Sequence, residues 1–400
     1  MRVTAVLGSL FGDEGKGQLV SYLAKKDSLV VRFSGGAQAG HTVESPGGRR
    51  HVFHQYGSGT LKGAATYLAS TTLFDPIALT EEADALQKLV GAELPCIYID
   101  PLCPVVTPYD CMLNQLTESA RCVDKHGSCG AGIGEAARRM EETPYKLHVA
   151  DLSSPLLDAK LASLRDYFEQ EMLRRRFDAD QSDVHTALFY AMRHFSDAVA
   201  QIANSPRHYI LLPLQTVLAR VEPRTVIAEG SQGVLLDRDM GVFPHVTRAK
   251  TGLWNLLPLL SVLNAHRLRV VFVSRCYSTR HGAGPLPLEG PVHGLEPSAK
   301  ETNKYNQWQG ELRYAPFNQA LLDWAQQRAL AEIPASVIGD ARTAITCLDQ
   351  IDGRIEVGPT GDERSPDWFH SQPELPAPVG FVSYGPTWTD VHDLFQLCST

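Results

Sequence analysis

A short apolar run near the N-terminus passes directly into a glycine-rich loop, and this junction limits the possible folds more than any other feature of the chain. Residues 3–7 (Val-Thr-Ala-Val-Leu) are followed at positions 8–17 by Gly-Ser-Leu-Phe-Gly-Asp-Glu-Gly-Lys-Gly, and Leu19, Val20 and Leu23 then continue with helical spacing. A buried strand, a tight glycine turn and a helix make up the local order of a parallel α/β unit. The chain is therefore expected to have an α/β fold.

Further apolar runs repeat this arrangement. Segments rich in valine and isoleucine that end abruptly in glycine or polar residues lie at 29–31, 225–228, 268–273, 344–346 and 380–382. Between them, helical spacing on one face is clearest in Leu188, Met192, Phe195, Val199 and Ile202. The alternation predicts a large, mostly parallel central sheet flanked by helices. Because open parallel sheets bind ligands beyond the carboxyl ends of their strands, one site is expected to collect the polar clusters that follow the runs.

No internal repeat or low-complexity linker divides the sequence. We therefore expect a single domain over residues 1–400, with a helical insertion around residues 152–220. Inside that insertion, the run of Arg174, Arg175 and Arg176 is interpreted as a solvated helix face, with an anion contact as the alternative. The segment 359–378 is rich in Pro, Asp, Glu and Ser and predicts a surface loop before the last strand.

Composition narrows the classes of partner. A net charge of -8 with 20% charged residues lacks the basic excess that polymeric DNA or RNA would require. The eight cysteines are scattered without paired CxxC spacing, which favours reduced thiols over a zinc site or a disulfide framework. The first apolar run is too short for a signal-peptide core, and no later run approaches the roughly 20 residues of a membrane span. A cytoplasmic protein that does not bind membranes is expected.

The glycine-rich loop has the properties of a phosphate cradle. Its glycines allow backbone amides to approach phosphate oxygens, the start of the following helix favours an anion, and Lys16 can neutralise transferred charge. The loop departs from the usual P-loop motif, because Gly17 stands where Ser or Thr would bind magnesium. Asp13 is then the natural candidate for either a magnesium ligand or a general base.

A second glycine-rich turn follows the run at 29–31. It contains His41 between Gly40 and Thr42, a setting suited to proton transfer or to stabilising a transferring phosphoryl group. A lone histidine is more often structural, but the adjacent phosphate loop favours a functional role here.

Together these two loops resemble those of the adenylosuccinate synthetase family, whose N-terminus carries a GDEGKG loop followed by an NAGHT-type loop. The resemblance continues, in the same order, through EGSQG at 229–233 with LLD at 235–237 and PHVT at 244–247, TRHGAGP at 279–285, TCLD at 346–349 and SYGP at 383–386. It covers most of the chain. It implies a P-loop-like adenylosuccinate synthetase fold, a homodimer, and a ligase that uses GTP and Mg²⁺.

Residue roles follow from the same resemblance. In the family a base deprotonates N1 of the purine while GTP phosphorylates O6, and an amine then displaces the phosphate. The match implies that Asp13 is the base, His41 stabilises the transferring phosphoryl group, Lys16 contacts the nucleotide phosphates and Gln232 contacts the purine. Magnesium would be bound by the Asp13 carboxylate and the Gly40 carbonyl. The nucleotide contacts implied in addition are Gly12, Gly15, Gly17, Gln38, Gly130, Thr247, Asp349, Ser383 and Gly385, with Asp349 reading guanine.

The region that would bind the amine departs from the family pattern. The family's aspartate-binding TTGRxRR loop falls at residues 306–313 (Asn-Gln-Trp-Gln-Gly-Glu-Leu-Arg), where only Gly310 and Arg313 correspond. Paired arginines suit a dicarboxylate, so Glu311 or Leu312 in place of one of them should weaken aspartate binding. Arg280 or Arg313 remains available for a single carboxylate. Trp308 either forms a wall of the pocket or packs within its loop.

The purine side departs as well. Residues 128–134 keep the glycine frame of the family's T-G-R-G-I-G segment without its threonine and arginine, and Gln38 stands where asparagine is usual. Cys347 replaces a lysine that would stack on guanine, which leaves ATP open as the co-substrate. Arg138 and Arg139 are a weak match for the family arginine that reaches across the dimer interface.

Three hypotheses result. The first is an enzyme that aminates an IMP-like 6-oxopurine nucleotide, with aspartate as the default amine. The second keeps this chemistry but uses GMP or dGMP, as in phage enzymes of the 2-aminoadenylosuccinate type, or an amine other than aspartate. Those phage relatives carry serine where this chain keeps Asp13, so Asp13 favours ordinary N1 deprotonation. The third is a nucleotide-binding regulatory protein without turnover, against which Lys16, His41 and Gln232 argue.

Overall fold

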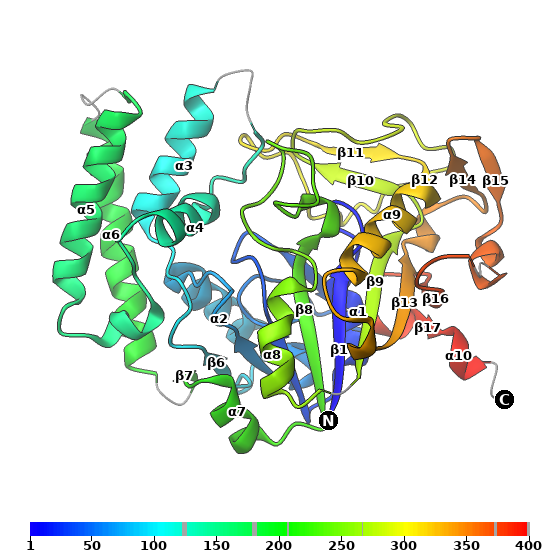
Figure 1. Ribbon diagram of the computed structural model, residues 1–400, viewed down its shortest axis with the longest axis horizontal. Coiled ribbons are helices and arrows are strands. Elements are labelled where there is room, and N and C mark those ends of the chain that lie inside the picture. Colours follow the sequence, from blue (N-terminus) through cyan, green and yellow to red (C-terminus); the bar gives the residue numbers. More distant parts are fainter. Residues whose placement is uncertain (122–125, 178–181, 206–207, 266, 372–373, 398–400) are drawn as a thin grey trace.

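A ten-stranded sheet forms the centre of the molecule in a computed structural model, which describes residues 1–121, 126–177, 182–205, 208–265, 267–371 and 374–397 (Figure 1). The strands, in spatial order, are β17 (Val391–Asp393), β16 (Val379–Ser383), β13 (Ile338–Thr346), β9 (Leu268–Arg275), β1 (Arg2–Gly8), β8 (Thr225–Gly233), β2 (Ser28–Arg32), β5 (Ala65–Leu68), β6 (Ile97–Ile99) and β7 (Tyr209–Leu211). Every neighbouring pair is parallel except β16 with β17. All six apolar runs of the sequence lie in these strands, which confirms the predicted sheet.

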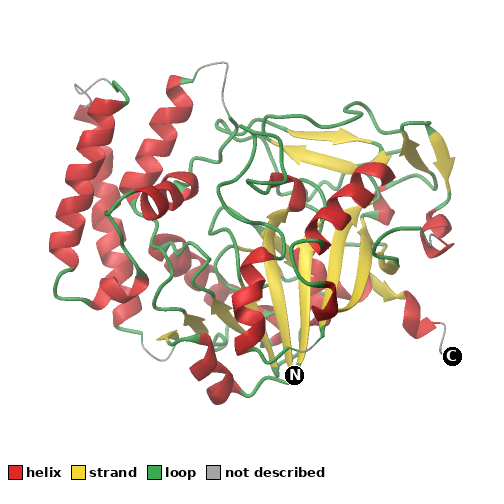
Figure 2. Ribbon diagram, in the orientation of Figure 1, coloured by secondary structure: helices red, strands yellow, loops and turns green. Residues whose placement is uncertain are grey.

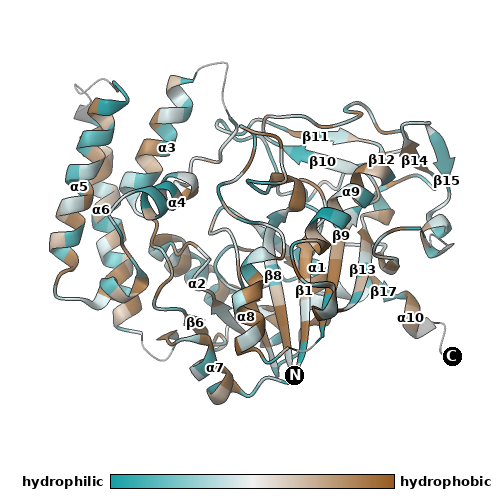
Figure 3. Cartoon of the chain, viewed as in Figure 1, coloured by the Kyte–Doolittle hydropathy of each residue, from teal (hydrophilic) through white to brown (hydrophobic). Residues whose placement is uncertain are grey.

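The central strands are apolar because both faces of the sheet are covered. In β1, Val3, Ala5 and Leu7 join one core cluster, while Val6 contacts the opposite cluster together with Leu19 of the following helix. Strands buried on both faces lose the alternation of polar and apolar residues and become continuous apolar runs. Figure 3 shows β1 as a largely hydrophobic ribbon, whereas the outer helix α5 has mixed hydropathy.

Helices flank the sheet and form a separate group at one end of it (Figure 2). Those next to the strands are α1 (Lys16–Leu23), α2 (Pro76–Val90), α7 (Leu214–Val221), α8 (Leu257–Val262) and α9 (Gln319–Leu330), and the short α10 (Leu394–Leu397) follows β17. The group at the end beyond β6 and β7 contains α3 (Pro108–Ala120), α4 (Ile133–Glu142), α5 (Leu157–Arg174) and α6 (Ser182–Ala203). Helix α6 packs against α2, which joins this group to the sheet layer.

Three small sheets complete the fold. They are the hairpin of β3 (His41–Glu44) with β4 (Arg50–Phe53), the hairpin of β10 (Ser278–His281) with β11 (Leu312–Ala315), and a three-stranded sheet of β12 (Phe317–Asn318), β14 (Ile355–Gly358) and β15 (Asp362–Arg364). The sequence analysis predicted a surface loop at residues 359–378, and this prediction is wrong in part. It contains β15 and a 3-10 helix, Pro366–Ser371, which Phe369 anchors in the core.

The helical part of the chain also differs from its prediction in detail. Helices α3 and α4 precede residue 152, and the predicted insertion ends with strand β7 and helix α7. In the arginine run, Arg174 and Arg176 are exposed, but Arg175 donates to Glu135 and Glu171. The prediction of a solvated face is wrong for Arg175, because its guanidinium joins the ion pairs between α4 and α5. The single-domain organisation stays a prediction.

Arg139 is 1% exposed and forms the most enclosed ion pair of the helical group. Its Nε donates to Asp110 Oδ1 at 2.9 Å, and its Nη2 donates to Asp110 Oδ2 at 2.9 Å and to the Val105 carbonyl at 2.8 Å. Asp110 in turn accepts from Thr107 at the start of α3. Arg139 thus bonds groups of its own chain, which gives no support to its match with the family arginine that reaches across a dimer interface. Arg138 likewise bonds Glu135, Glu171 and Tyr167.

No disulfide forms among the cysteines that lie in the described ranges, while Cys122 and Cys398 fall outside them. Of the helices described, none has the length and apolar character needed to cross a membrane.

We predict that Arg139→Ala lowers the free energy of unfolding by about 3–5 kcal/mol, because Asp110 would remain buried without its counter-charge. Chemical denaturation followed by circular dichroism measures this change. Arg165→Ala is the matched control, since the Arg165 side chain is 59% exposed and forms only long ion pairs; a loss below about 1 kcal/mol is expected there. Equal losses in the two variants would contradict the assignment.

Candidate active site

The glycine-rich loop (residues 8–17) joins the end of β1 to the start of α1, as predicted. Asp13 and Gly15 have φ of 60° and 93°, and Gly15 is the residue that precedes the helix. A side chain at Gly8 would overlap the Glu14 carboxylate and come within 3.0 Å of Lys16 Nζ. Gly8 is therefore required so that the side chains of Glu14 and Lys16 can fold back over the end of the strand.

Two neighbouring strands hold the backbone of this loop. Arg275 Nε at the end of β9 donates to the Asp13 carbonyl at 2.6 Å, and Thr346 Oγ1 at the end of β13 donates to the Glu14 carbonyl at 2.8 Å. The backbone amide of Leu10 donates to the Glu14 carboxylate. The loop is therefore fixed from outside as well as by its own glycines.

Burial perturbs the charged groups of the loop. It raises the pKa of Glu14 to about 8 and lowers the pKa of Lys16, and the attraction between the two side chains opposes both shifts. Burial also raises the pKa of Asp13, against the influence of Arg275 and Lys16. A carboxylate with a raised pKa is a better proton acceptor near neutral pH than an ordinary aspartate.

His41 begins β3 and is buried against the end of β8. Its Nδ1 lies 2.6 Å from Glu229 Oε1, and its Nε2 lies 2.9 Å from the Ser231 carbonyl. Burial opposes ionisation of Glu229, but His41, Arg32 and Ser58 outweigh it and lower the pKa of Glu229 to about 2. Burial lowers the pKa of His41, and the Glu229 carboxylate opposes this shift. Glu229 thus orients the imidazole, as a carboxylate orients a catalytic histidine.

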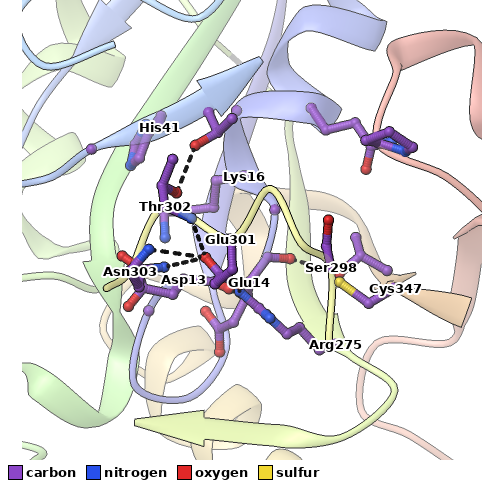
Figure 4. Close-up of a pocket in the computed structure, with 18 of the residues that line it drawn as sticks. Asp13, Glu14, Lys16, His41, Arg275, Ser298, Glu301, Thr302, Asn303 and Cys347 are labelled. Carbon is purple, nitrogen blue, oxygen red and sulfur yellow. Dashed lines mark hydrogen bonds and ion pairs between the residues drawn. The ribbon is translucent and has the colours of Figure 1, made fainter. Parts of the chain in front are cut away.

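A cavity of about 480 Å³ lies over the loop (Figure 4). It collects eleven of the predicted site residues, namely Gly12, Asp13, Gly15, Lys16, Gly17, Gln38, Gly40, His41, Gln232, Asp349 and Gly385. We call it the first cavity. It is also lined by Arg275 and by the loop of residues 298–303, for which the sequence pattern gave no role. In Figure 4, Glu301, Thr302 and Asn303 lie beside Asp13.

A second cavity of about 600 Å³ adjoins the first, and both share Gln38, Gln232, His281 and Gln309. Thr247, Ser128, Cys129 and Arg280 line only the second one. The side-chain oxygens of Gln38 and Gln232 are buried without a hydrogen-bond partner. Buried acceptors without a partner are costly, so the boundary between the cavities suits a ligand with N–H donors.

Three predicted residues stand outside both cavity walls. Gly130 lies against the indole of Trp308, since a side chain there would lie 3.0 Å from the ring. Trp308 itself lines neither cavity, which favours a packed aromatic over a wall of the pocket. Ser383 accepts from Gln18 Nε2 at 2.9 Å, and the same amide holds the Gly385 carbonyl at 2.6 Å. Ser383 therefore belongs to the connection that fixes the C-terminal turn on α1. Arg313 lines a separate recess beside β11.

Both arginines predicted to bind the amine substrate instead form hydrogen bonds or ion pairs with other groups of the chain. Arg280 is 2% exposed and donates to the carbonyls of Ala283, Pro285 and His245 at 3.1, 2.9 and 2.9 Å. Arg313 pairs with Glu289 at 2.6 Å and donates to the carbonyls of Gly282 and Gly284, both at 2.7 Å. In this arrangement they hold the loop at 282–285 together.

The oxygen donors at the first cavity fit a magnesium ion. The Asp13 carboxylate and the Gly40 backbone border the same cavity. Mg²⁺ commonly takes one or two carboxylates and completes its shell with phosphate oxygens and water. In the parts of the chain described, no cluster of three or more His, Cys, Asp or Glu side chains forms a dedicated metal cage.

Several site residues escaped the sequence analysis. Arg275 stands two residues after the predicted strand at 268–273, so its place at a carboxyl end was the signal that could have found it. Gln18 lies inside a helix, and residues 298–303 form an irregular loop. Neither Gln18 nor this loop carries a pattern that places it at the cavity.

We predict that Glu14→Gln stabilises the protein at neutral and basic pH. The carboxyl of Glu14 has a pKa of about 8 in the folded protein, against an ordinary value of 4.5. Between these two pH values the unfolded state loses the proton first, so ionisation of Glu14 increasingly favours unfolding as the pH rises. Below pH 4.5 the group is protonated in both states and has no such effect. The amide keeps the acceptor for Leu10, and the gain at pH 8 is at most about 5 kcal/mol. Denaturation at pH 4.5 and pH 8 measures it, with the exposed Glu169→Gln as control. A gain that does not depend on pH would contradict the buried carboxyl.

Comparison with known proteins places this site in a known fold. The family model for adenylosuccinate synthetase matches residues 5–311. The chain is 33% identical over 288 residues to adenylosuccinate synthetase of Acidithiobacillus ferrooxidans, covering 71% of this chain and 64% of that protein's length. It is 31% identical over 369 residues to the Nitrosomonas europaea adenylosuccinate synthetase, covering 89% of this chain and 80% of the relative.

Solved structures share the fold over almost the full chain. The fully ligated adenylosuccinate synthetase of Plasmodium falciparum has a TM-score of 0.68 at 18% identity and covers 98% of this chain and 99% of its own. The succinoaminodeoxyadenylate synthetase of cyanophage S-2L, bound to dGMP and dATP as an energy donor, has a TM-score of 0.64 at 19% identity and covers 100% and 97%. With the match of the family model and the sequence identity to its members, the chain belongs to the adenylosuccinate synthetase family.

Proposed function

We propose that the chain is a carbon–nitrogen ligase that phosphorylates O6 of an IMP-like 6-oxopurine nucleotide and replaces the phosphate with an amine, by default that of aspartate to give adenylosuccinate. The observation that carries this proposal is the meeting of Asp13, Lys16, His41 and Gln232 on one cavity. Phosphoryl transfer depends mainly on positioning and charge stabilisation, and these residue types supply both. The family relatives, named as adenylosuccinate synthetases, support it.

Each residue has a defined task in this proposal. Asp13 accepts the proton from N1 of the purine, so that O6 can attack the γ-phosphorus of the nucleoside triphosphate and the nucleoside diphosphate leaves. Lys16 and the backbone amides of the glycine-rich loop hold the phosphates. His41 keeps its Nδ1 on Glu229 and turns its Nε2 from the Ser231 carbonyl to the transferred phosphoryl group. The amine nitrogen then attacks C6, and the O6 phosphate departs. A magnesium ion, held by Asp13 and Gly40, would neutralise charge on the phosphates.

The co-substrate of the proposed reaction is GTP, with ATP as the alternative. Asp349 lines the first cavity at the turn that carries Cys347, and a carboxylate suits the N1–H and 2-amino donors of guanine. Cys347 offers no cation to stack on the base. We further propose a homodimer that works in the cytoplasm.

A second candidate changes the purine. The unpartnered amide oxygens of Gln38 and Gln232 suit a base with several N–H donors, and guanine has more of these than hypoxanthine. The cyanophage relative is a dGMP-bound protein of the same fold. GMP or dGMP therefore stays the alternative to IMP.

The amine is the other variable. Because Arg280 and Arg313 are committed to protein groups, an amine with fewer carboxylates than aspartate is the second candidate on this side. The third hypothesis, a regulatory protein without turnover, would leave no reason for the cluster of perturbed carboxyl, amine and imidazole groups in one cavity.

We predict that purified protein with Mg²⁺, GTP or ATP, an amino acid and one of IMP, GMP or dGMP forms a new nucleotide, detected by mass, with phosphate released. Asp13→Asn is expected to reduce turnover by about 10²–10⁴-fold, because the amide cannot accept the N1 proton. Asp158→Asn, on the exposed side of α5, is the control. Absence of product in every combination, with equal phosphate release by wild type and Asp13→Asn, would support the regulatory protein instead.

We predict that Arg313→Ala changes the apparent affinity for the amine substrate by less than about threefold, because Arg313 faces a different recess and is paired with Glu289. Saturation curves for aspartate, alanine and asparagine, measured with both proteins, provide the test. A loss of aspartate affinity of tenfold or more, with the other two amines unaffected, would restore Arg313 to the amine site.

A further inference from the structure

Arg275 lies in the wall of the first cavity, and the proposed reaction gives it no task. It is the last residue of β9 and is 6% exposed. Its guanidinium donates to three separate segments, from Nε to the Asp13 carbonyl at 2.6 Å, from Nη1 to the Tyr277 hydroxyl at 2.8 Å, and from Nη2 to Glu301 Oε2 at 3.0 Å. A rigid guanidinium that bonds three segments fixes their relative positions.

The contact with Asp13 matters because the backbone there is in an unfavourable region. Asp13 has φ of 60°, in the left-handed region that most residues avoid, and it follows Gly12 with φ of 89°. Glycine-rich backbone of this kind has several accessible conformations, so an external anchor on a carbonyl selects one of them. Arg275 is therefore in a position to fix the peptide that carries the proposed base.

The contact with Glu301 connects the same guanidinium to the loop of residues 298–303. The other oxygen of Glu301 accepts from the backbone amides of Thr302 and Asn303 at 2.9 and 3.1 Å and from Asn303 Nδ2 at 3.0 Å. Burial alone would raise the pKa of Glu301, but Arg275 and these donors outweigh it and lower the pKa. The ionised carboxylate both folds its own loop and docks that loop on Arg275 (Figure 4).

The loop is held from the opposite side by the β3–β4 hairpin. Lys300 Nζ lies 2.6 Å from Glu44 Oε1, and Arg50 Nη2 donates to the Lys300 carbonyl at 2.6 Å. The hydroxyls of Thr42 and Thr302 are 3.2 Å apart. Residues 298–303 thus connect the hairpin that carries His41 to the strand end that anchors Asp13, along the wall of the first cavity.

We propose that Arg275 is a positioning residue that couples docking of loop 298–303 to the placement of Asp13. When Glu301 is docked, its charge holds the guanidinium in the orientation that grips the Asp13 carbonyl. When loop 298–303 moves away, Arg275 loses its ion pair with Glu301, and its hydrogen bond to the Asp13 carbonyl weakens. The loop and the base are thereby assembled together. Only the catalytic consequence of this coupling rests on the proposed function.

Hydrogen exchange followed by mass spectrometry tests the coupling without any turnover. In Glu301→Gln, we expect amide exchange to increase about tenfold in residues 298–303 and also in residues 10–15, which Glu301 does not bond. Arg275→Lys keeps the positive charge but loses the planar guanidinium that bonds three groups at once, so amide exchange should increase in both segments. Arg269→Gln, on the same strand and paired with Asp340 at the surface, is the control and should change neither. Unchanged exchange in residues 10–15 of a folded Glu301→Gln protein would overturn the proposal.

Kinetics provide a second, separate readout. Each single variant should lower kcat by about 10²-fold with less than a threefold change in KM for the nucleoside triphosphate, as expected for misplacement of a reacting group. The double variant should be no worse than Arg275→Lys alone, because the two residues act as one unit. Losses that multiply would contradict this. An inactive wild-type protein would overturn the proposed function and leave the exchange experiment to decide the coupling.

Discussion

Strand β1 pairs in parallel with β8 on one side and β9 on the other, and the site depends on this register. Gly8 lies opposite both Gly233 and Val273, Arg32 of β2 lies opposite Glu229 of β8, and Arg275 of β9 lies opposite Thr346 of β13. Because the strands end at a common edge, the polar residues after each apolar run meet over the glycine-rich loop. A shift of one residue in β9 or β13 would remove the donors that hold the carbonyls of Asp13 and Glu14.

The second requirement of the site is that its buried charged groups are stabilised by their neighbours. Glu229 is stabilised in its ionised form by His41, Arg32 and Ser58, whereas Glu14 and Lys16 have pKa values moved toward neutrality by burial. Nearby phosphate groups would favour the protonated forms of Lys16 and Glu14, so the cradle is better matched to an anionic ligand than to an empty cavity. Buried groups of this kind are typical of sites that bind and transfer charged groups.

The strands and the main loop could be predicted from the sequence because their signals are local. Apolar runs buried on both faces and the glycines of residues 8–17 identify the sheet and the cradle, and Asp13, Lys16 and His41 do line one cavity. What could not be predicted depends on partners distant in sequence. Arg280 and Arg313 suggest a carboxylate site until their contacts with carbonyls and Glu289 are seen, and Glu301 becomes part of the site only through Arg275. The three-residue strands β6 and β7 are too short for a periodic pattern.

The central claim is that the cavity over the glycine-rich loop transfers a phosphoryl group to the purine O6. Labelling the 6-oxygen of the purine substrate with ¹⁸O and analysing the released phosphate by mass spectrometry tests this transfer most directly. The account predicts one ¹⁸O atom in each phosphate released with product, because the bond broken in the second step joins C6 to that oxygen. Phosphate without label, formed at the same rate as the aminated nucleotide, would show that the purine oxygen is never phosphorylated and would contradict the account.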